Sequence, residues 1–147
     1  MAVRVQAEGF DPGAELSGFA CGRTDVGAVV SFTGVVRDTD GGLDRMEIEH
    51  YPGMTERAIA AMVETATARW DLADCLVIHR HGAMMPGEQI MMVATAAPHR
   101  VAAFEAAEFL MDYLKSRAPF WKKEFGTDGS GWVESKDEDE DALSRWE

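Results

Sequence analysis

Two long stretches of helical periodicity, each set between short strand-like segments, limit the folds open to this chain of 147 residues. Apolar residues recur at spacings of three and four from about Thr55 to Trp70, and again from about His99 to Arg117. Such spacing is typical of an amphipathic helix with one face on a core. The positions expected to face that core are Ile59, Met62, Val63, Ala66 and Trp70 in the first helix, and Val101, Phe104, Ala107, Met111 and Leu114 in the second.

The remaining segments are mostly strand-like. We expect a short helix over residues 12–19 and strands over residues 3–8, 27–37, 46–51, 75–80, 90–96 and 132–135. The strand over 46–51 is expected to pair with the strand over 27–37, in which Gly34 suggests a bulge or a close backbone approach. Strands and helices in this order predict an α+β fold with a mixed or antiparallel sheet and two main helices.

Length and composition favour one globular domain. We assign residues 1–135 to this domain and residues 136–147 to an acidic C-terminal tail, expected to be solvated or frayed.

No apolar run approaches the roughly 20 residues of a membrane-spanning helix, and the first residues lack the apolar core of a signal peptide. Cys21 and Cys75 lie far apart beside apolar residues and are expected as buried free thiols. A cytoplasmic protein, with no membrane partner, is expected.

The charge of the chain is strongly negative, with a formal net charge of -12. Nucleic acid is therefore not an expected partner, because phosphate contacts need a broad basic surface. Residues 99–124 differ from the rest, since they hold five basic and four acidic side chains. Such a local basic region can hold a small anion. The histidines show no spacing typical of metal ligands, so no metal site is expected.

The strongest chemical signal is a cluster of lysines that follows the second helix. The chain has four lysines, and Lys115, Lys122 and Lys123 lie close together in its sequence. Unlike arginine, lysine can lose its proton when burial or a neighbouring cation lowers its pKa. The cluster therefore suggests a site for an anionic or carbonyl-bearing ligand. A helix end with favourable C-terminal cations is the alternative interpretation.

Pro119 cannot continue a helix, so the second helix should end by Ala118. The lysines beyond it lie in extended chain, where adjacent side chains point to opposite sides. Only one of Lys122 and Lys123 should therefore face the same site as Lys115.

A second group of candidates could bind an anion. His99 and Arg100 stand at the start of the second helix, where free backbone N–H groups favour a phosphate, and Arg37 ends a strand. A capping histidine and solvated arginines are the alternatives. His99 lies roughly 24 Å from Lys115 along the helix, so either one long ligand contacts both or two chains share the site. Glu124 could orient a lysine or accept a hydrogen bond from a ligand N–H. A surface ion pair is the alternative interpretation.

Several motifs in order resemble the catalytic, large-subunit family of molybdopterin synthases, over almost the whole chain from Val29 to Trp146. The motifs lie at residues 31–38, 49–54, 77–82, 86–88, 98–104 and 111–124. The resemblance implies an α/β-hammerhead-like domain. It also implies a sulfurtransferase that inserts two sulfurs into cyclic pyranopterin monophosphate to form the dithiolene of molybdopterin, with no metal or organic cofactor.

The resemblance also implies a partner and an assembly. Sulfur would arrive on the C-terminal glycine thiocarboxylate of a small ubiquitin-like subunit, whose tail enters a pocket on the large subunit. The family assembly is a heterotetramer, in which a homodimer of large subunits carries a small subunit at each end. Its pocket draws on both large subunits.

The resemblance assigns roles to individual residues. Lys115 and Lys122 would be catalytic. The substrate would be bound by Val35, Val36, Arg37, His99, Arg100, Lys115, Lys122, Lys123 and Glu124, and the pocket would include Phe32 and Met111. Val35 stands where some relatives carry lysine, which puts a substrate contact by its side chain in doubt. The short, acidic segment 39–45 could order on binding.

A non-enzymatic module that binds a ubiquitin-like tail or a phosphorylated metabolite is the alternative function. The lysines and aromatic residues would then serve binding alone. Tight partner binding without turnover of the pterin would distinguish it from the enzyme.

Overall fold

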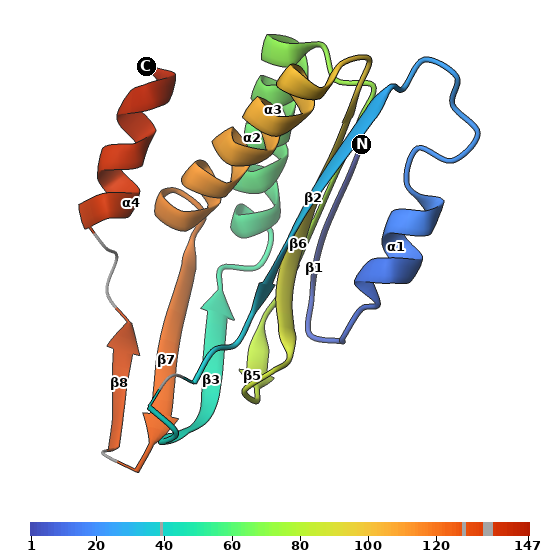
Figure 1. Ribbon diagram of the computed structural model, residues 1–147. Coiled ribbons are helices and arrows are strands. Elements are labelled where there is room, and N and C mark those ends of the chain that lie inside the picture. Colours follow the sequence, from blue (N-terminus) through green and yellow to red (C-terminus); the bar gives the residue numbers. More distant parts are fainter. Residues whose placement is uncertain (39, 128, 134–136) are drawn as a thin grey trace.

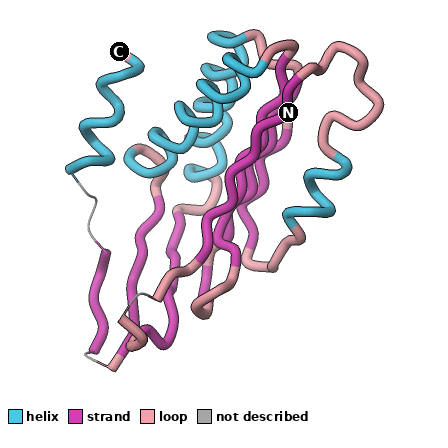
Figure 2. Tube along the Cα trace, viewed as in Figure 1, coloured by secondary structure: helices cyan, strands magenta, loops and turns pink. Residues whose placement is uncertain are grey.

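A computed structural model describes residues 1–38, 40–127, 129–133 and 137–147 of the chain. The described residues form two four-stranded sheets with helices against them (Figures 1 and 2). The elements are β1 (Ala2–Gln6), α1 (Pro12–Gly18), β2 (Ala28–Val35), β3 (Leu43–His50), α2 (Met54–Trp70), β4 (Asp74–Arg80), β5 (Gly82–Met84), β6 (Gln89–Ala97), α3 (Arg100–Ser116), β7 (Phe120–Gly126), β8 (Gly129–Val133), α4 (Asp137–Ala142) and the 3₁₀ turn η1 (Leu143–Trp146).

The first sheet has the order β1-β4-β6-β2 and the second the order β5-β3-β7-β8. In the first, β1 runs parallel to β4 and the other neighbours are antiparallel; the second is antiparallel throughout. The long helices α2 and α3 cover one face of the first sheet, and α1 lies on the other side (Figure 1). The predicted α+β fold, with mixed and antiparallel sheets and two main helices, is confirmed.

The main core lies between the two long helices and the first sheet, and it extends to buried residues of the second sheet such as Ile48. Strands β4 and β6 are buried along almost their whole length. This explains why both sequences are nearly continuous in apolar character, as strands covered on both faces are. A smaller cluster packs the outer face of the first sheet against Phe10 and Phe19, which flank α1.

The core face of α2 was predicted correctly, but that of α3 was wrong at its start. Val101 and Phe104 are 61% and 60% exposed. The predicted Ala107 and Leu114 are buried, and the other buried residues of α3 are Ala103, Ala106, Phe109 and Leu110. The three alanines let this helix lie close to the sheet and to α2, so the face that carries them is the one that packs.

The predicted pairing of segment 46–51 with segment 27–37 is also wrong, because β3 pairs with β5 and β7. The predicted irregularity at Gly34 explains the difference. The register of β2 against β6 shifts between Gly34 and Val35, and the chain then leaves the first sheet and starts the second. Strand β7 had no clear sequence signal, since its charged residues hide the strand pattern.

The C-terminal segment is not the solvated tail that its charge predicted. Leu143 is 4% exposed, and the Trp146 ring packs edge-on against Trp70 and Phe109. Arg145 forms ion pairs with Glu108 and Asp112 of α3. A few apolar residues after the acidic run therefore fix this segment to the domain. Residues 134–136, which include part of the last predicted strand, lie outside the described residues.

Two further sequence expectations concern thiols and membranes. Cys75 is buried as expected, whereas Cys21 is exposed, and both are free. In the described part of the chain, no helix is long and apolar enough to cross a membrane.

We expect the substitution Leu143→Ala to lower the free energy of unfolding by about 2–4 kcal/mol, because it leaves a cavity under the C-terminal turn. Urea denaturation measures this loss. The matched control is Leu16→Ala at an exposed position of α1, which should change stability by no more than about 0.5 kcal/mol. Equal effects of the two substitutions would mean that the C-terminal segment does not pack in solution.

Candidate active site

The candidate site is built on a sharp reversal between α3 and β7. Helix α3 ends at Ser116, and the Phe120 N–H then donates to the Ala118 carbonyl at 2.8 Å. The buried Thr55 hydroxyl donates to the Pro119 carbonyl at 3.0 Å. The same hydroxyl accepts the Tyr51 N–H at 2.9 Å. The first turn of α2 thus fixes the turn that starts β7.

This reversal brings Lys115, in the last turn of α3, near Lys122 on β7. The pKa of Lys122 is lowered from 10.5 to about 8, first by burial and then by the positive charge of Lys115, while Asp139 opposes the shift. Lys123 lies on the other side of β7, with its Nζ 5.3 Å from the ring centroids of Phe125 and Trp132. As alternation predicted, the two lysines lie on opposite sides of β7, with Lys122 on the side of Lys115.

His79 on β4 is a neighbour of the lysines that sequence reasoning did not connect to them. Its ring is 5% exposed and stacks on the Phe120 ring with centroids 3.8 Å apart. Burial lowers the pKa of His79 to about 3; the Arg80 carbonyl opposes this shift, and the charges of Lys122 and Lys115 add to it. The proximity was not predictable, because β4 and β7 belong to different sheets.

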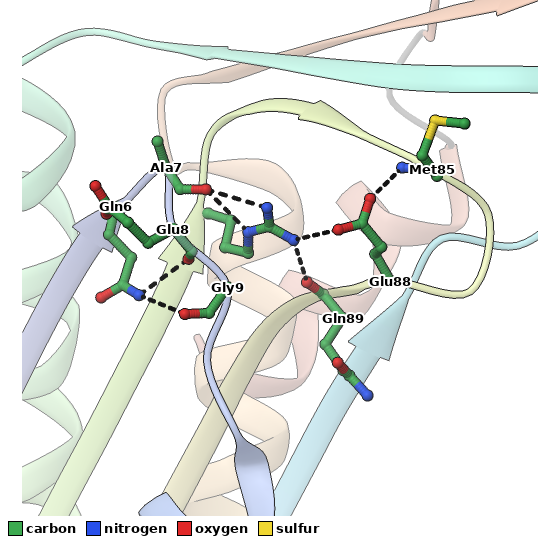
Figure 3. Close-up of polar contacts among 8 residues, drawn as sticks. Gln6, Ala7, Glu8, Gly9, Met85, Glu88 and Gln89 are labelled. Atoms are coloured by element: carbon green, nitrogen blue, oxygen red, sulfur yellow. Dashed lines mark hydrogen bonds and ion pairs between the residues drawn. The ribbon is translucent and has the colours of Figure 1, made fainter.

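Arg80, next to His79 in β4, anchors the turn between β5 and β6, and Figure 3 shows the residues that accept its hydrogen bonds, Ala7, Glu88 and Gln89. Its guanidinium is 8% exposed and donates to the Ala7 carbonyl at 3.1 and 3.2 Å. It also donates to the Glu88 carboxylate at 3.3 Å and to the Gln89 carbonyl at 3.4 Å. The other Glu88 oxygen accepts the Met85 N–H at 2.5 Å. The buried cation is therefore fully engaged in holding the turn between β5 and β6.

The turn between β5 and β6 also holds the chain where it leaves β2. The Val36 N–H donates to the Glu88 carbonyl at 2.9 Å, and the Gly87 N–H donates to the Val36 carbonyl at 2.8 Å. The Val36 side chain is in the main core, whereas Val35 is 49% exposed. Arg37 follows as an exposed cation at this end of the sheet.

His99 and Arg100 lie at the other end of β2. The Gly27 N–H donates to the Ala97 carbonyl at 3.0 Å, and a Cβ on Gly27 would lie 2.2 Å from the Pro98 carbonyl oxygen. This close approach fixes the entry to α3 beside the start of β2. His99 is the N-cap of α3, and about 24 Å of helix separates it from Lys115. Within one chain, His99 and Arg100 therefore lie too far from Lys115 to contact the same small ligand.

The other predicted residues are spread around the second sheet and its neighbours. Glu124 is exposed on the same face of β7 as Lys122, and it lines a hollow of about 470 Å³ together with Asp38 and Trp132. Phe32 is 43% exposed on β2, and Met111 packs partly buried against the main core. Within the ranges that the structure describes, no three His, Cys, Asp or Glu side chains gather as they would around a metal ion.

Comparisons with known proteins agree with one another. The family described as MoaE protein matches residues 5–117. A relative from Cereibacter sphaeroides, named molybdopterin synthase catalytic subunit, is 66% identical over 146 residues, which is 99% of this chain and 100% of the relative.

Solved structures give the same likeness. A molybdopterin biosynthesis MoaE protein from Burkholderia ambifaria is 46% identical with a TM-score of 0.85, over 99% of this chain and 98% of that chain. The molybdopterin synthase from Staphylococcus aureus is 30% identical with a TM-score of 0.79, over 89% of this chain and 96% of that chain.

We expect Lys122 to titrate with a pKa of about 8 and the substitution Lys115→Met to raise that pKa. Removing the neighbouring charge favours the ammonium, but burial persists, so the value should stay below 10.5. The pH dependence of acetylation at Lys122, followed by peptide mass spectrometry, measures it. An unchanged pKa in the variant would contradict the proximity of the two lysines.

Proposed function

The chain belongs to the MoaE protein family, and on this premise we propose that it is the catalytic subunit of a molybdopterin synthase. The observation that carries the proposal is the pairing of Lys115 with the partly buried Lys122 at the turn into β7. The relatives' names and the motifs at residues 31–38 and 111–124 support the same function.

The proposed reaction moves sulfur from a protein to a small molecule, and we place it in the cytoplasm. A small ubiquitin-like subunit presents a C-terminal thiocarboxylate, and cyclic pyranopterin monophosphate receives its sulfur. In each transfer a carbon–sulfur bond forms at a side-chain carbon of the pterin and a carbon–oxygen bond at that carbon breaks, the oxygen leaving as water or staying on the phosphate. Water then cleaves the acyl–sulfur bond and leaves the small subunit with a C-terminal carboxylate. Two transfers form the dithiolene.

The two lysines would have different tasks. Lys115, as an ammonium, stabilises the negative charge that develops on the acyl oxygen when the thiocarboxylate reacts or is cleaved. Lys122 has a pKa of about 8, so both of its forms are populated near neutral pH. An amine of this kind can accept and return a proton during the transfer. In this scheme the lysines need no cofactor.

The exposed cations would bind the substrate's phosphate. Arg37 stands at the end of β2, and His99 and Arg100 stand at the start of α3 beside free backbone N–H groups, where anions bind readily. Glu124 would contact the pterin from the same face of β7 as Lys122. Phe32 and Met111 would contribute apolar walls, and Val35 and Val36 would line the strand end near Arg37.

A homodimer would bring the two ends of α3 to one ligand. Among the described residues, β2 pairs with β6 alone, so its other edge is free. Phe32 and Phe104 are 43% and 60% exposed along this edge and the adjoining helix, and Val29 is 43% exposed on the other face of the strand. Exposed apolar side chains along an unpaired edge are typical of an interface. A two-fold axis near the middle of β2 would place the start of one copy's strand beside the end of the other's.

His99 and Arg100 of one chain would form a clamp on the phosphate. Each pocket of such a dimer would take its lysines from one chain and this His99–Arg100 clamp from the other. A small subunit at each end of the dimer would complete a heterotetramer. The long distance between clamp and lysines within one chain is the observation that favours this arrangement.

We expect Lys115→Ala to lower dithiolene formation about 10²–10³-fold, as the loss of an oxyanion-stabilising group does. Folding and binding of the small subunit should survive. Product is measured by mass spectrometry after mixing with thiocarboxylated small subunit and cyclic pyranopterin monophosphate. The control is Arg23→Ala, which removes an exposed cation paired with Asp25 and should keep full activity. Full activity of the lysine variant would exclude the proposed role.

Mixing two inactive variants tests the shared pocket. We expect Lys115→Ala and the double variant His99→Ala/Arg100→Ala to be nearly inactive alone. After they are dissociated and reassembled together, about one quarter of the pockets should be intact, because half of the dimers are mixed and each mixed dimer has one unaltered pocket. Activity near that fraction is expected. No recovery, with mixed dimers present, would show that each pocket uses one chain only.

A further inference from the structure

The proposed mechanism leaves one polar group near the lysines without a role, the buried imidazole of His79. The ring is held on two sides. Its Nδ1 lies 2.8 Å from the Arg80 carbonyl oxygen, and its plane lies 18° from that of the Phe120 ring with which it stacks. A side chain held in this way has one orientation.

The carbonyl contact also fixes which nitrogen carries the proton. A carbonyl oxygen only accepts hydrogen bonds, so Nδ1 must be the donor, and in a neutral ring Nε2 then presents a bare lone pair. Burial keeps the ring neutral, since the pKa of His79 falls to about 3. His79 is therefore a fixed hydrogen-bond acceptor that does not become charged in the physiological range.

The lone pair lies in the neighbourhood of the lysines. Phe120, on which the ring stacks, precedes Lys122 by two residues in β7, and residues two apart in a strand point to the same side. The charges acting on His79 come from Lys122, Lys115 and His81. His81 stacks on His50 instead, with ring centroids 4.0 Å apart, and no lysine is among the charges that act on it.

We propose that His79 is a positioning residue for the lysine pair: rotation of the Lys122 side chain, which makes no hydrogen bond to the imidazole in this structure, brings its amine to the bare Nε2, and that hydrogen bond directs the amine toward the reacting thiocarboxylate. This inference rests on the proposed function and adds a residue to it. A partly buried ammonium beside a second cation needs an acceptor, and a neutral one supplies it without holding the proton as tightly as a carboxylate would. The amine thus stays able to release its proton.

A satisfied core histidine is the competing explanation, and the pKa of Lys122 distinguishes the two. His79→Phe keeps a stacking ring, and His79→Asn keeps an N–H donor for the Arg80 carbonyl, but both lack Nε2. Each should lower the pKa of Lys122 by about one unit, which raises the ratio of neutral amine to ammonium about tenfold. His79→Gln, whose amide oxygen can reach the place of Nε2, should restore most of the shift.

The readout is pH-dependent acetylation of Lys122 by acetic anhydride in the full chain, followed by peptide mass spectrometry. Lys115 and Asp139 are the charges that act on Lys122, and both are unchanged in every variant. The matched control is His81→Phe, two residues along the chain, which should leave the pKa of Lys122 unchanged. If the folded Phe and Asn variants also leave it unchanged, the proposal is overturned; the Asn variant decides alone if the Phe variant does not fold.

Kinetics of the assembled synthase give a second readout. His79→Phe should lower kcat about tenfold or more, as displacement of a proton-transfer group does, while KM for the pterin stays within about twofold. His79→Gln should recover part of kcat. The acetylation experiment needs no turnover, so failure of the wild-type protein to make product would contradict the proposed function without deciding the role of His79.

Discussion

The arrangement of the site depends on the reversal at Pro119. Proline ends α3 there, and the buried Thr55 hydroxyl holds the Pro119 carbonyl at 3.0 Å. The reversal places the last turn of α3 against the first residues of β7, so Lys122 lies partly buried next to Lys115. The stack of Phe120 on His79 joins the second sheet to the first at the same point. Two cations are thus held close by the packing of a helix, a turn and two sheets.

The charges around Lys115 and Lys122 belong to a chain that is otherwise acidic. The C-terminal helix α4 brings Asp139 close enough to raise the pKa of Lys122, against the larger effects of burial and of Lys115. Its neighbour Glu140 forms an ion pair with Arg117, which follows α3. Carboxylates at the margin of the site therefore moderate the repulsion between the lysines. A negative protein can hold this local positive site because the opposing charges lie around it.

Much of the fold was predictable from local patterns, and the failures have physical causes. Helix α2 and the bulge at Gly34 followed from periodicity and from glycine chemistry. The core face of α3 did not, because packing selected small alanines over the larger Phe104. Burial of Leu143 was hidden by the acidic residues before it. In the site, alternation placed Lys122 and Lys123 on opposite faces correctly, whereas the approach of His79 required knowledge of how two sheets meet.

The central claim is that this lysine pair acts on a thiocarboxylate to make a dithiolene. Its most direct test is to mix the purified protein with a thiocarboxylated small subunit and cyclic pyranopterin monophosphate, and to identify the pterin product by mass spectrometry. We expect a product that has gained two sulfur atoms, with the small subunit returned as its carboxylate. A stable complex that leaves the pterin unchanged would contradict it and would indicate a protein that only binds.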